Sequence, residues 1–519
     1  MKAYLFVDFG STNTKLTLID IEKEEIIATS KAYTTVETNV MNGYEEAYEM
    51  LMDQVDEDVD IIKKTACSSA AGGLKMIAIG LVDELTAEAA KRAALGAGAR
   101  VLHTYCGNLN RREAKEIAES NLDIILLAGG TDGGNVDCIT HNAMMLANAE
   151  VKVPVVVAGN KSALDDIDDI FDGKVEYYVA ENVMPKLNVI NVESSRELIR
   201  KIFMKNITKA RGMTHVQEDI SAIIMPTPAA VLKAAEVLSK GTKNEEGMGE
   251  LAVIDIGGAT TDIHSLTKGL PTRSSVLLRG LQEPYAKRTV EGDLGMRRSI
   301  RSVVEGASPK MLADYLGENY EYDVEGEAKF RFENSDFIAR TERDLNYDVA
   351  MAKICTRLSM KRHAGRLEET YSPMGPVQQQ WGKDLSNLKT IIGTGGVLVY
   401  TDHAAEILSA AIYNMEDPES LEPVHPDFYL DSRYILSAMG LLCMIDPDMA
   451  VRMMKKYIIK VEGAHETTEQ EDPRGRLHEG APGGAGFMAY GKGCGFAGGC
   501  GLPQENPGGE KLRGSDEES

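Results

Sequence analysis

Two aspartates in this chain each stand at the end of an apolar segment, directly before a turn that contains glycine. Asp8 follows residues 4–7, and Asp255 lies near the end of the apolar residues 251–256. A short apolar run predicts a buried strand, in which an acid is rare unless it has a partner or a task. Because carboxylate oxygens are the ligands that magnesium prefers, we expect Asp8 and Asp255 to hold a magnesium ion beside a phosphate.

The two turns that follow these aspartates have the composition of phosphate-binding loops. Glycine lets the backbone approach a phosphate closely, threonine supplies hydroxyl groups, and lysine offsets the phosphate charge. We therefore expect the turns to cradle the β- and γ-phosphates of a nucleotide. The expected contacts are Gly10, Ser11, Thr12, Asn13 and Lys15 from the first turn and Gly257, Gly258, Thr260 and Thr261 from the second.

A third glycine-rich turn, with Gly393, Gly395 and Gly396, follows the apolar residues 390–392. Each of the three turns taken alone is a common connection between a strand and the next element, so none identifies a site. Two acid-ended hairpins followed by a glycine-rich turn form a much more specific combination. This combination indicates a site for a phosphate and its magnesium ion.

The order of these motifs resembles that of the ATPase superfamily formed by actin, Hsp70 and the sugar kinases. VDFGSTNTK and IDIGGATTD are similar to its first and second phosphate loops, IIGTGG to its adenosine loop, and SAMGLL to the helix after that loop. The resemblance implies an α/β fold with two duplicated, ribonuclease H-like halves, and ATP and Mg as ligands. It places adenosine against the third turn. It also adds Asp262 to Asp8 and Asp255 as a candidate catalytic residue, which either orients water or caps a turn.

Four further stretches resemble the MutL/GlmL-type accessory proteins of glutamate mutase, which are distinct from the mismatch-repair protein of the same name. They are CSSAAGGLKMIAIGLV (residues 67–82), LLAGGTDGGN (126–135), RTVEGDLGMR (288–297) and GKGCGFAGGCG (491–501). This resemblance implies an ATP-hydrolysing, chaperone-like reactivating factor. Its partner would be a B12-dependent mutase, glutamate mutase or a related aminomutase, whose damaged cobalamin it helps to exchange for intact adenosylcobalamin.

Two other functions are compatible with the same ATPase fold. A small-molecule kinase would consume ATP only in the presence of an acceptor, but the chain shows no sugar-binding signature. An ATP-dependent dehydratase activator would hold an iron–sulfur cluster through cysteines, and the sequence offers no convincing set of them. The corrin itself is not expected to bind, because residues 262–267 approach the Asp-x-His-x-x-Gly motif but lack its glycine.

The composition limits the partners and the surroundings of the protein. Acids outnumber bases by 80 to 56, and the formal net charge of −24 argues against nucleic acid or an anionic membrane as the main partner. Seven scattered cysteines and the lack of a signal-peptide pattern predict a reduced, cytoplasmic protein. We expect no membrane-spanning segment, because the apolar runs are too short, and a homodimer stays open as an oligomeric state.

The length of 519 residues predicts several domains. Between residues 66 and 205 strand and helix patterns alternate, which is typical of a mainly parallel sheet covered by helices. We expect this segment to be an α/β domain inserted into the first ATPase half, and to be the part that binds the partner or swivels. The expected division is 1–65 and 206–248 for the first half, 66–205 for the insert, 249–460 for the second half and 461–519 for a mobile tail rich in glycine and proline.

Some stretches allow more than one interpretation. Residues 126–135 place a glycine pair and an acid after an apolar strand, so they are a rival phosphate loop, a tight turn in the insert or a binding surface. Cys494 and Cys500 are either metal ligands or parts of a flexible tail. Residues 306–344 give mixed signals and receive no role.

The charged stretch 288–301 is also open to two interpretations. Its side chains Glu291, Asp293 and Arg297 either form an edge of the nucleotide cleft or belong to a helix that starts near Gly292 or Asp293. In the second case the acids complement the positive end of the helix dipole.

Overall fold

The structure is a computed structural model, and it describes residues 1–10, 12–34, 40–56, 58–69, 74–207, 222–317, 322–373 and 375–462. The chain divides into two compact units, Met1–Ala464 and His465–Ser519, and the described residues all belong to the first. Ser11 and the predicted tail beyond residue 462, with Cys494 and Cys500, lie outside the described residues. No helix in the described ranges is both long and apolar enough to cross a bilayer.

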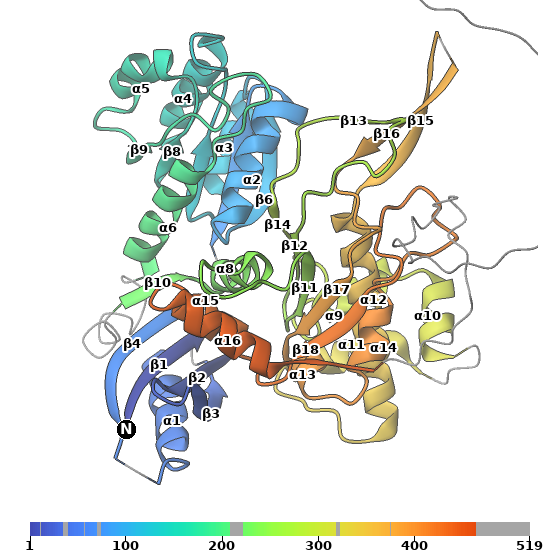
Figure 1. Ribbon diagram of the computed structural model, residues 1–519. Coiled ribbons are helices and arrows are strands. Elements are labelled where there is room, and N and C mark those ends of the chain that lie inside the picture. The colour runs from blue at the N-terminus through green and yellow to red at the C-terminus, as the bar shows by residue number, and fades with distance from the viewer. Residues whose placement is uncertain are drawn as a thin grey trace, which may run out of the picture. The chain divides into compact units, whose positions relative to one another are not determined.

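The first sheet has five strands in the order β10-β4-β1-β2-β3 (Figure 1). β1 pairs antiparallel with β2 and β2 antiparallel with β3, whereas β1 and β10 both pair parallel with β4. The central strands are apolar because both faces are covered, one by α1 and the other by α8 and α15. The bounds are β1 Lys2–Phe9, β2 Asn13–Asp20, β3 Glu25–Tyr33, α1 Val40–Met52, β4 Asp60–Ser68, β10 Ala222–Pro226, α8 Thr227–Lys240 and α15 Leu436–Leu442.

The second sheet repeats this arrangement, in the order β14-β12-β11-β17-β18-β19. β11 pairs antiparallel with β12 and β12 antiparallel with β14, whereas β17 pairs parallel with both β11 and β18. Helix α12 covers one face, and α8 and α15 cover the other. The bounds are β11 Leu251–Ile256, β12 Thr261–Leu266, β14 Ala286–Glu291, α12 Glu342–His363, β17 Thr390–Thr394, β18 Asp427–Asp431 and β19 Ile458–Lys460. The repeated strand order confirms the predicted α/β fold with two duplicated halves.

A third sheet, between β4 and β10 in the chain, has five parallel strands in the order β6-β5-β7-β8-β9. Helices α2 and α6 pack on one face, and α3, α4 and α5 on the other. The bounds are β5 Lys75–Gly80, a π-helical turn Asp83–Ala87, α2 Glu88–Gly96, β6 Arg100–Cys106, α3 Arg111–Glu119, β7 Ile124–Leu127, α4 Asp137–Asn148, β8 Val155–Val157, a 3₁₀ turn Lys161–Ala163, α5 Leu164–Phe171, β9 Tyr177–Val179 and α6 Glu193–Ile207. This sheet confirms the inserted α/β domain, and the boundaries of the four predicted domains stay a prediction.

Most of the remaining elements lie around the second sheet, and α16 packs against α8 and α15. Three strands form a small separate sheet in the order β13-β16-β15, and short helices fill the connections. The bounds are β13 Val276–Leu278, α9 Ile300–Gly306, α10 Pro309–Leu316, α11 Val324–Glu333, β15 Arg366–Ser372, β16 Gly375–Trp381, α13 Gly396–Val399, α14 Ala404–Ser409 and α16 Pro447–Tyr457.

The helix expected to start near Gly292 or Asp293 does not form there. β14 ends at Glu291 and the next helix begins only at Ile300. The backbone N–H of Met296 donates to the carbonyl of Gly257, and those of Arg297 and Arg298 donate to the carbonyl of Gly258. The segment after β14 is therefore held against the second glycine turn, because its backbone donors are used there and not within a helix.

Helices α8 and α15 pack against each other between the two duplicated sheets (Figure 1). Their contact is so close that a Cβ atom added to Gly440 of α15 would lie 1.9 Å from the carbonyl oxygen of Ala230 in α8. The buried side chains around these helices come from both sheets, including Phe6 of β1 and Val253 of β11. The helix pair therefore joins the two halves behind the site.

We expect Gly440→Ala to destabilise the protein by about 2–3 kcal/mol, because the new methyl group overlaps backbone that cannot move without separating the helices. Gly306→Ala is the matched control, since a Cβ atom at Gly306 would meet only the Leu358 side chain at an ordinary 3.6 Å. Thermal unfolding of both variants measures the difference. A Gly440→Ala protein as stable as the control would show that the two helices lie farther apart than described.

Candidate functional site

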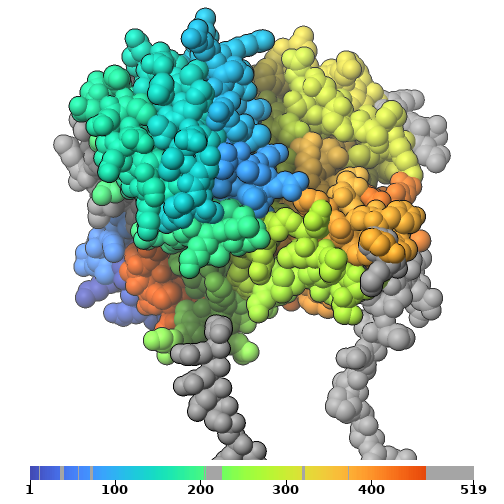
Figure 2. Space-filling model, turned by 90° about the horizontal axis from the view of Figure 1, so that it is seen from above, coloured from blue at the N-terminus to red at the C-terminus, as the bar shows by residue number. Residues whose placement is uncertain are grey.

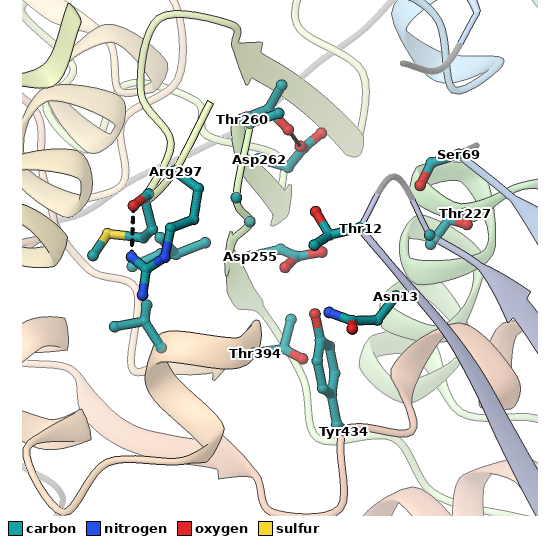
Figure 3. Close-up of a pocket in the computed structure, with 18 of the residues that line it drawn as sticks. Thr12, Asn13, Ser69, Thr227, Asp255, Thr260, Asp262, Arg297, Thr394 and Tyr434 are labelled. Atoms are coloured by element: carbon teal, nitrogen blue, oxygen red, sulfur yellow. Dashed lines mark hydrogen bonds between the residues drawn. The ribbon is translucent and has the colours of Figure 1, made fainter. Parts of the chain in front are cut away.

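A cavity of about 720 Å³ lies between the β1–β2 hairpin of the first sheet and the β11–β12 hairpin of the second. The start of α8, the turn after β17 and residues 335–339 complete its walls. Figure 3 shows Thr12, Asn13, Asp255 and Tyr434 pointing toward a common space in this cavity. Segments that are far apart in the chain therefore meet at one place.

Most of the predicted site residues line this cavity. They are Asp8, Gly10, Thr12, Asn13, Lys15, Asp255, Gly257, Gly258, Thr260, Asp262 and Gly396. Three of the predicted residues have other positions. The Thr261 hydroxyl is fully buried and donates to the carbonyl of Leu294 at 2.9 Å, which corrects the expectation that it reaches a phosphate. Gly393 and Gly395 do not line the cavity, and added Cβ atoms at these two positions would meet Leu408 Cδ1 at 3.0 Å and the Ile256 carbonyl oxygen at 2.3 Å respectively.

The first turn is tight enough to require glycine. The Gly10 N–H donates to the carbonyls of Asp8 at 3.0 Å and of Asn13 at 3.1 Å. A Cβ atom at Gly10 would lie 2.5 Å from the Asn13 carbonyl oxygen, so no other residue fits without moving the backbone. This closed turn holds Thr12 and Asn13 at the edge of the cavity.

The backbone carbonyls of the second turn accept hydrogen bonds from the segment that follows β14. The Gly257 N–H donates to the carbonyl of Thr260 at 2.9 Å, which closes the turn. The Gly257 carbonyl accepts from Met296 N–H at 3.0 Å, and the Gly258 carbonyl accepts from Arg297 N–H at 2.8 Å. With its carbonyls engaged in this way, the turn is suited to present backbone N–H groups to an anion.

Asp8 is held by side chains from several other elements. Its Oδ1 accepts a hydrogen bond from the Thr227 hydroxyl at 2.6 Å, and its Oδ2 accepts one from the Ser437 hydroxyl at 3.1 Å. Lys15 Nζ lies 3.5 Å from Oδ2. Thr227 begins α8 and Ser437 belongs to α15, so the helix pair between the two sheets positions this carboxylate.

Lys15 is the cation that lies beside Asp8 in the cavity. Burial alone would lower its pKa, but the Tyr434 hydroxyl and the carboxylates of Asp8 and Asp255 outweigh burial and raise the pKa above its ordinary value. The Lys15 ammonium lies 3.5 Å from the centre of the Tyr434 ring, a cation–π contact. Tyr434 itself has a backbone φ of 55°, which is uncommon for a residue other than glycine and marks local strain at the cavity.

Asp255 is the carboxylate whose surroundings most favour a cation. Burial and the negative charge of Asp262 raise its pKa to about 7, Asp8 and Asp431 add to this effect, and Lys15 offsets part of it. A carboxyl group in such surroundings gains from a cation placed beside it. The donor set fits magnesium, because magnesium binds to few carboxylates and keeps several of its waters.

Asp262 is engaged by a guanidinium group. Its Oδ1 lies 2.7 Å from Arg288 Nε and 2.6 Å from Arg288 Nη2. Its Oδ2 accepts a hydrogen bond from the Thr260 hydroxyl at 3.1 Å (Figure 3). Asp262 is therefore neither isolated nor a simple turn cap, since it links the second turn to β14.

Of the three candidates in the stretch 288–301, only Arg297 lines the cavity. Its Nη2 donates to the Phe337 carbonyl at 2.9 Å and to Asp348 Oδ2 at 3.1 Å. Glu291 and Asp293 instead pair with Arg362, whose Nη1 lies 2.7 Å from Glu291 and 2.9 Å from Asp293. This pairing corrects the expectation that the two acids form an edge of the cleft.

Several residues that line the cavity were not predicted from the sequence. They are Thr227, Tyr434 and Ser437 around the first turn, Thr394 beside Asp255, and Asp348 with residues 335–339 on the second-half wall. The stretch 306–344 received no role because it has no clear periodicity. Its contribution becomes visible only once Arg297 connects Phe337 and Asp348.

The rival phosphate loop, residues 126–135, belongs to the inserted sheet and does not line the cavity. Two asparagines hold its backbone. Asn160 accepts from Gly133 N–H at 3.1 Å and donates to the carbonyl of Gly134 at 3.1 Å, while Asn182 donates to Asp132 at 2.9 Å. These bonds make it a tight strand-to-helix turn in the insert.

Comparison with known proteins shows the family of the chain. The family model described as "MutL protein" matches residues 4–458. The protein named "Protein MutL" of Clostridium tetanomorphum is 58% identical over 463 residues, which cover 89% of this chain and 100% of that protein.

Solved structures give weaker similarities. A xylulose kinase from Lactobacillus acidophilus has a TM-score of 0.32 at 12% identity, covering 89% of this chain and 93% of the kinase. A glycerol dehydratase reactivase has a TM-score of 0.30 at 9% identity, covering 85% of this chain and 99% of the reactivase. Because these TM-scores are low, the strand order of the sheets defines the fold.

Proposed function

Because this chain belongs to the MutL protein family, we propose that it is a Mg-dependent ATPase that reactivates an adenosylcobalamin-dependent mutase. The observation that carries the proposal is the convergence of both acid-ended turns, Lys15 and Gly396 on one cavity. The resemblance of the motifs to the glutamate mutase accessory proteins supplies the partner, which is glutamate mutase or a related aminomutase.

The residues of the two turns would bind the β- and γ-phosphates. Lys15 offsets their charge, and its raised pKa keeps it an ammonium ion at neutral pH. Thr12 and Asn13 would supply side-chain contacts, and the backbone N–H groups of residues 258–260 would face the phosphates from the other half. A nucleotide held in this way touches both halves at once.

Asp255 would hold the magnesium ion directly. Asp8, whose oxygens already accept from Thr227 and Ser437, would reach the ion through one of its waters. When bound, magnesium neutralises charge on the phosphates during transfer. Asp262 is anchored by Arg288 through one oxygen, and its other oxygen, which accepts from the Thr260 hydroxyl, has a second lone pair with which it would orient the attacking water.

Adenosine would lie against the third turn. Gly395 has a φ of 102° and lets this turn approach β11, while Gly396 borders the cavity. The apolar side chains of Phe337, Ile338 and Val349 line the same wall and would face the base. Ile338 is 66% exposed, which is unusual for its type and is consistent with a platform that a ligand covers.

Hydrolysis would change how firmly the two halves are held together, because ATP contacts both and ADP holds them less completely. The proposed use of this motion is to loosen a mutase that carries damaged cobalamin, so that intact cofactor can replace it. The inserted sheet, within residues 66–205, is the proposed partner-binding or swivelling part.

The test is a reactivation assay. Glutamate mutase inactivated by bound hydroxocobalamin is mixed with this protein, fresh adenosylcobalamin and Mg-ATP. We expect mutase activity to return with ATP and not with a hydrolysis-resistant analogue. ATP consumption without any return of activity would reject the reactivating role and leave an ATPase. ATP consumption only after a metabolite acceptor is added would point to a small-molecule kinase.

A further inference from the structure

Arg288 connects the candidate nucleotide site to the inserted sheet. Its guanidinium donates to Asp262 from Nε at 2.7 Å, while Nη1 donates to the backbone carbonyls of Leu95 at 3.2 Å and Ala99 at 2.8 Å. Leu95 lies in the last turn of α2, and Ala99 directly precedes β6. One side chain on β14 therefore holds an acid of the cavity and the end of a helix in the insert.

The surroundings of Arg288 make this connection stiff. The Arg288 side chain is only 2% exposed and that of Asp262 only 9%, so little water can replace a lost contact. An unpaired buried charge is costly, which means that the guanidinium must follow if either partner moves. A cation at the C-terminal end of α2 also meets the negative end of the helix dipole. Displacing it would weaken the end of that helix.

Other contacts place the same corner of the insert against the nucleotide-binding segments. Arg100 lies against Gly292, where an added Cβ atom would be 2.2 Å from the guanidinium, and it also lines the cavity. A Cβ atom at Gly98 would meet Pro226, at the start of α8, at 2.8 Å. In Figure 2 the insert, in blue to teal, lies against yellow-green and orange parts of the chain. The turn between α2 and β6 thus contacts these segments, and Arg288 links it to Asp262.

We propose that Arg288 is a positioning residue that transmits the nucleotide state of the cavity, through Asp262, to the α2–β6 corner of the insert. The inference rests on the proposed ATPase function and adds a route by which the cavity and the inserted sheet influence each other. When Asp262 turns toward the nucleotide and its water, the guanidinium shifts with it, and the carbonyls of Leu95 and Ala99 lose or change their donor. The coupling is reciprocal, so a partner seated on the insert would alter the cavity by the same route.

Hydrogen exchange of the full-length protein tests the proposal. The hydrogen exchange of residues 88–106 is compared in three conditions: without nucleotide, with Mg-ADP, and with the magnesium complex of a hydrolysis-resistant ATP analogue. Calorimetry measures the binding of each nucleotide separately. In the wild type we expect exchange in this segment to change severalfold between nucleotide states. In Arg288→Lys, which keeps a charge beside Asp262 but lacks the fork that reaches the carbonyls, we expect nucleotide binding to persist and this change to disappear.

Arg92→Lys is the matched control. Arg92 also ties α2 to the second half, by donating to the Gln282 carbonyl at 2.9 Å and pairing with Glu283 at 3.3 Å, but it does not touch Asp262. We expect it to keep the nucleotide-dependent exchange. If Arg288→Lys does not fold, Asp262→Asn breaks the link from the other end and should also abolish the change.

Three results would overturn the inference. If the wild type binds nucleotide but the hydrogen exchange of residues 88–106 does not change, the nucleotide does not affect this segment. If the nucleotide-dependent exchange persists in Arg288→Lys, or is lost equally in Arg92→Lys, the effect does not depend specifically on Arg288. A wild-type protein that binds neither nucleotide would instead remove the proposed function itself, and the inference with it.

Discussion

Replacing Asp255 by asparagine is expected to lower phosphate release from Mg-ATP by about a thousandfold, while the folded protein becomes more stable at neutral and alkaline pH. A metal-bound carboxylate supplies several kcal/mol of charge stabilisation, and about 4 kcal/mol corresponds to a thousandfold in rate. Asp255 is the acid of the cavity whose surroundings most favour a cation, because burial and Asp262 raise its pKa to about 7. Asparagine keeps the shape and removes the charge.

The gain in stability follows from the same pKa. The carboxyl group of Asp255 has a folded-state pKa of about 7 against an ordinary value of 3.8. Below about pH 4 the carboxyl group is protonated in both the folded and the unfolded state, so it does not lower the free energy of unfolding. As the pH rises toward the folded-state pKa, its buried charge destabilises the folded protein increasingly. The stability advantage of Asp255→Asn should therefore grow between about pH 4 and pH 7 and stay constant above, at on the order of 4 kcal/mol.

Two measurements on the purified variant check this prediction. Phosphate release reports the activity, and thermal unfolding without nucleotide at several pH values reports the stability. Asp293→Asn is the matched control, because Asp293 pairs with Arg362 outside the cavity, and we expect its activity to be unchanged. Hydrolysis retained within a few-fold in Asp255→Asn would remove Asp255 from the site. A stability difference that shrinks with rising pH would contradict the electrostatic explanation.

Replacing Arg331 by methionine is expected to destabilise the second half by about 3–5 kcal/mol. The Arg331 side chain is fully buried, and it donates to Asp348 from Nε and to Glu327 from Nη1, both at 2.6 Å. Asp344 lies 3.7 Å away, and the ring of Tyr347 is 4.3 Å from the guanidinium. Methionine would leave three acids close together without their cation.

This loss would also reach the cavity. Asp348 accepts hydrogen bonds from both Arg331 and Arg297, and Arg297 holds the carbonyl of Phe337. We therefore expect Arg331→Met to weaken nucleotide binding as well as to lower the midpoint of thermal unfolding by several degrees. Calorimetric titration with Mg-ADP and thermal unfolding measure the two effects.

Arg343→Gln is the matched control for this change. The Arg343 side chain is 58% exposed and lies 3.6 Å from Glu327, so its loss should alter stability by no more than about 0.5 kcal/mol. If Arg331→Met were as stable as this control, the buried charges would not be paired as described. If it unfolded early but bound Mg-ADP normally when folded, the wall formed by Asp348 and Phe337 would not contribute to the site.

The two acid-ended turns could be predicted from the sequence because their signal is local. An apolar strand, an acid near its end and a glycine that allows a tight turn are all contained in a few residues, as Gly10 illustrates with its 2.5 Å approach to the Asn13 carbonyl. The α/β alternation of the insert is local in the same sense. These features depend on backbone conformation and burial, which short stretches largely determine.

The remaining parts of the site depend on contacts between distant segments. Thr227 and Ser437 meet Asp8 only because α8 and α15 pack together between the sheets, and no nearby residue indicates this. The helix expected near Asp293 does not form for a similar reason, because the Met296 N–H donates to the Gly257 carbonyl. The residues near a backbone N–H in the sequence do not reveal which distant carbonyl will accept its hydrogen bond.

We expect the cavity between the two acid-ended turns to hydrolyse ATP without any acceptor. Phosphate release from Mg-ATP by the purified full-length protein, with neither mutase nor metabolite added, tests it most directly. We expect slow but measurable phosphate release that stops when EDTA removes magnesium and that is lost in Asp255→Asn. Release that is absent under these conditions, or that proceeds unchanged in Asp255→Asn, would contradict it.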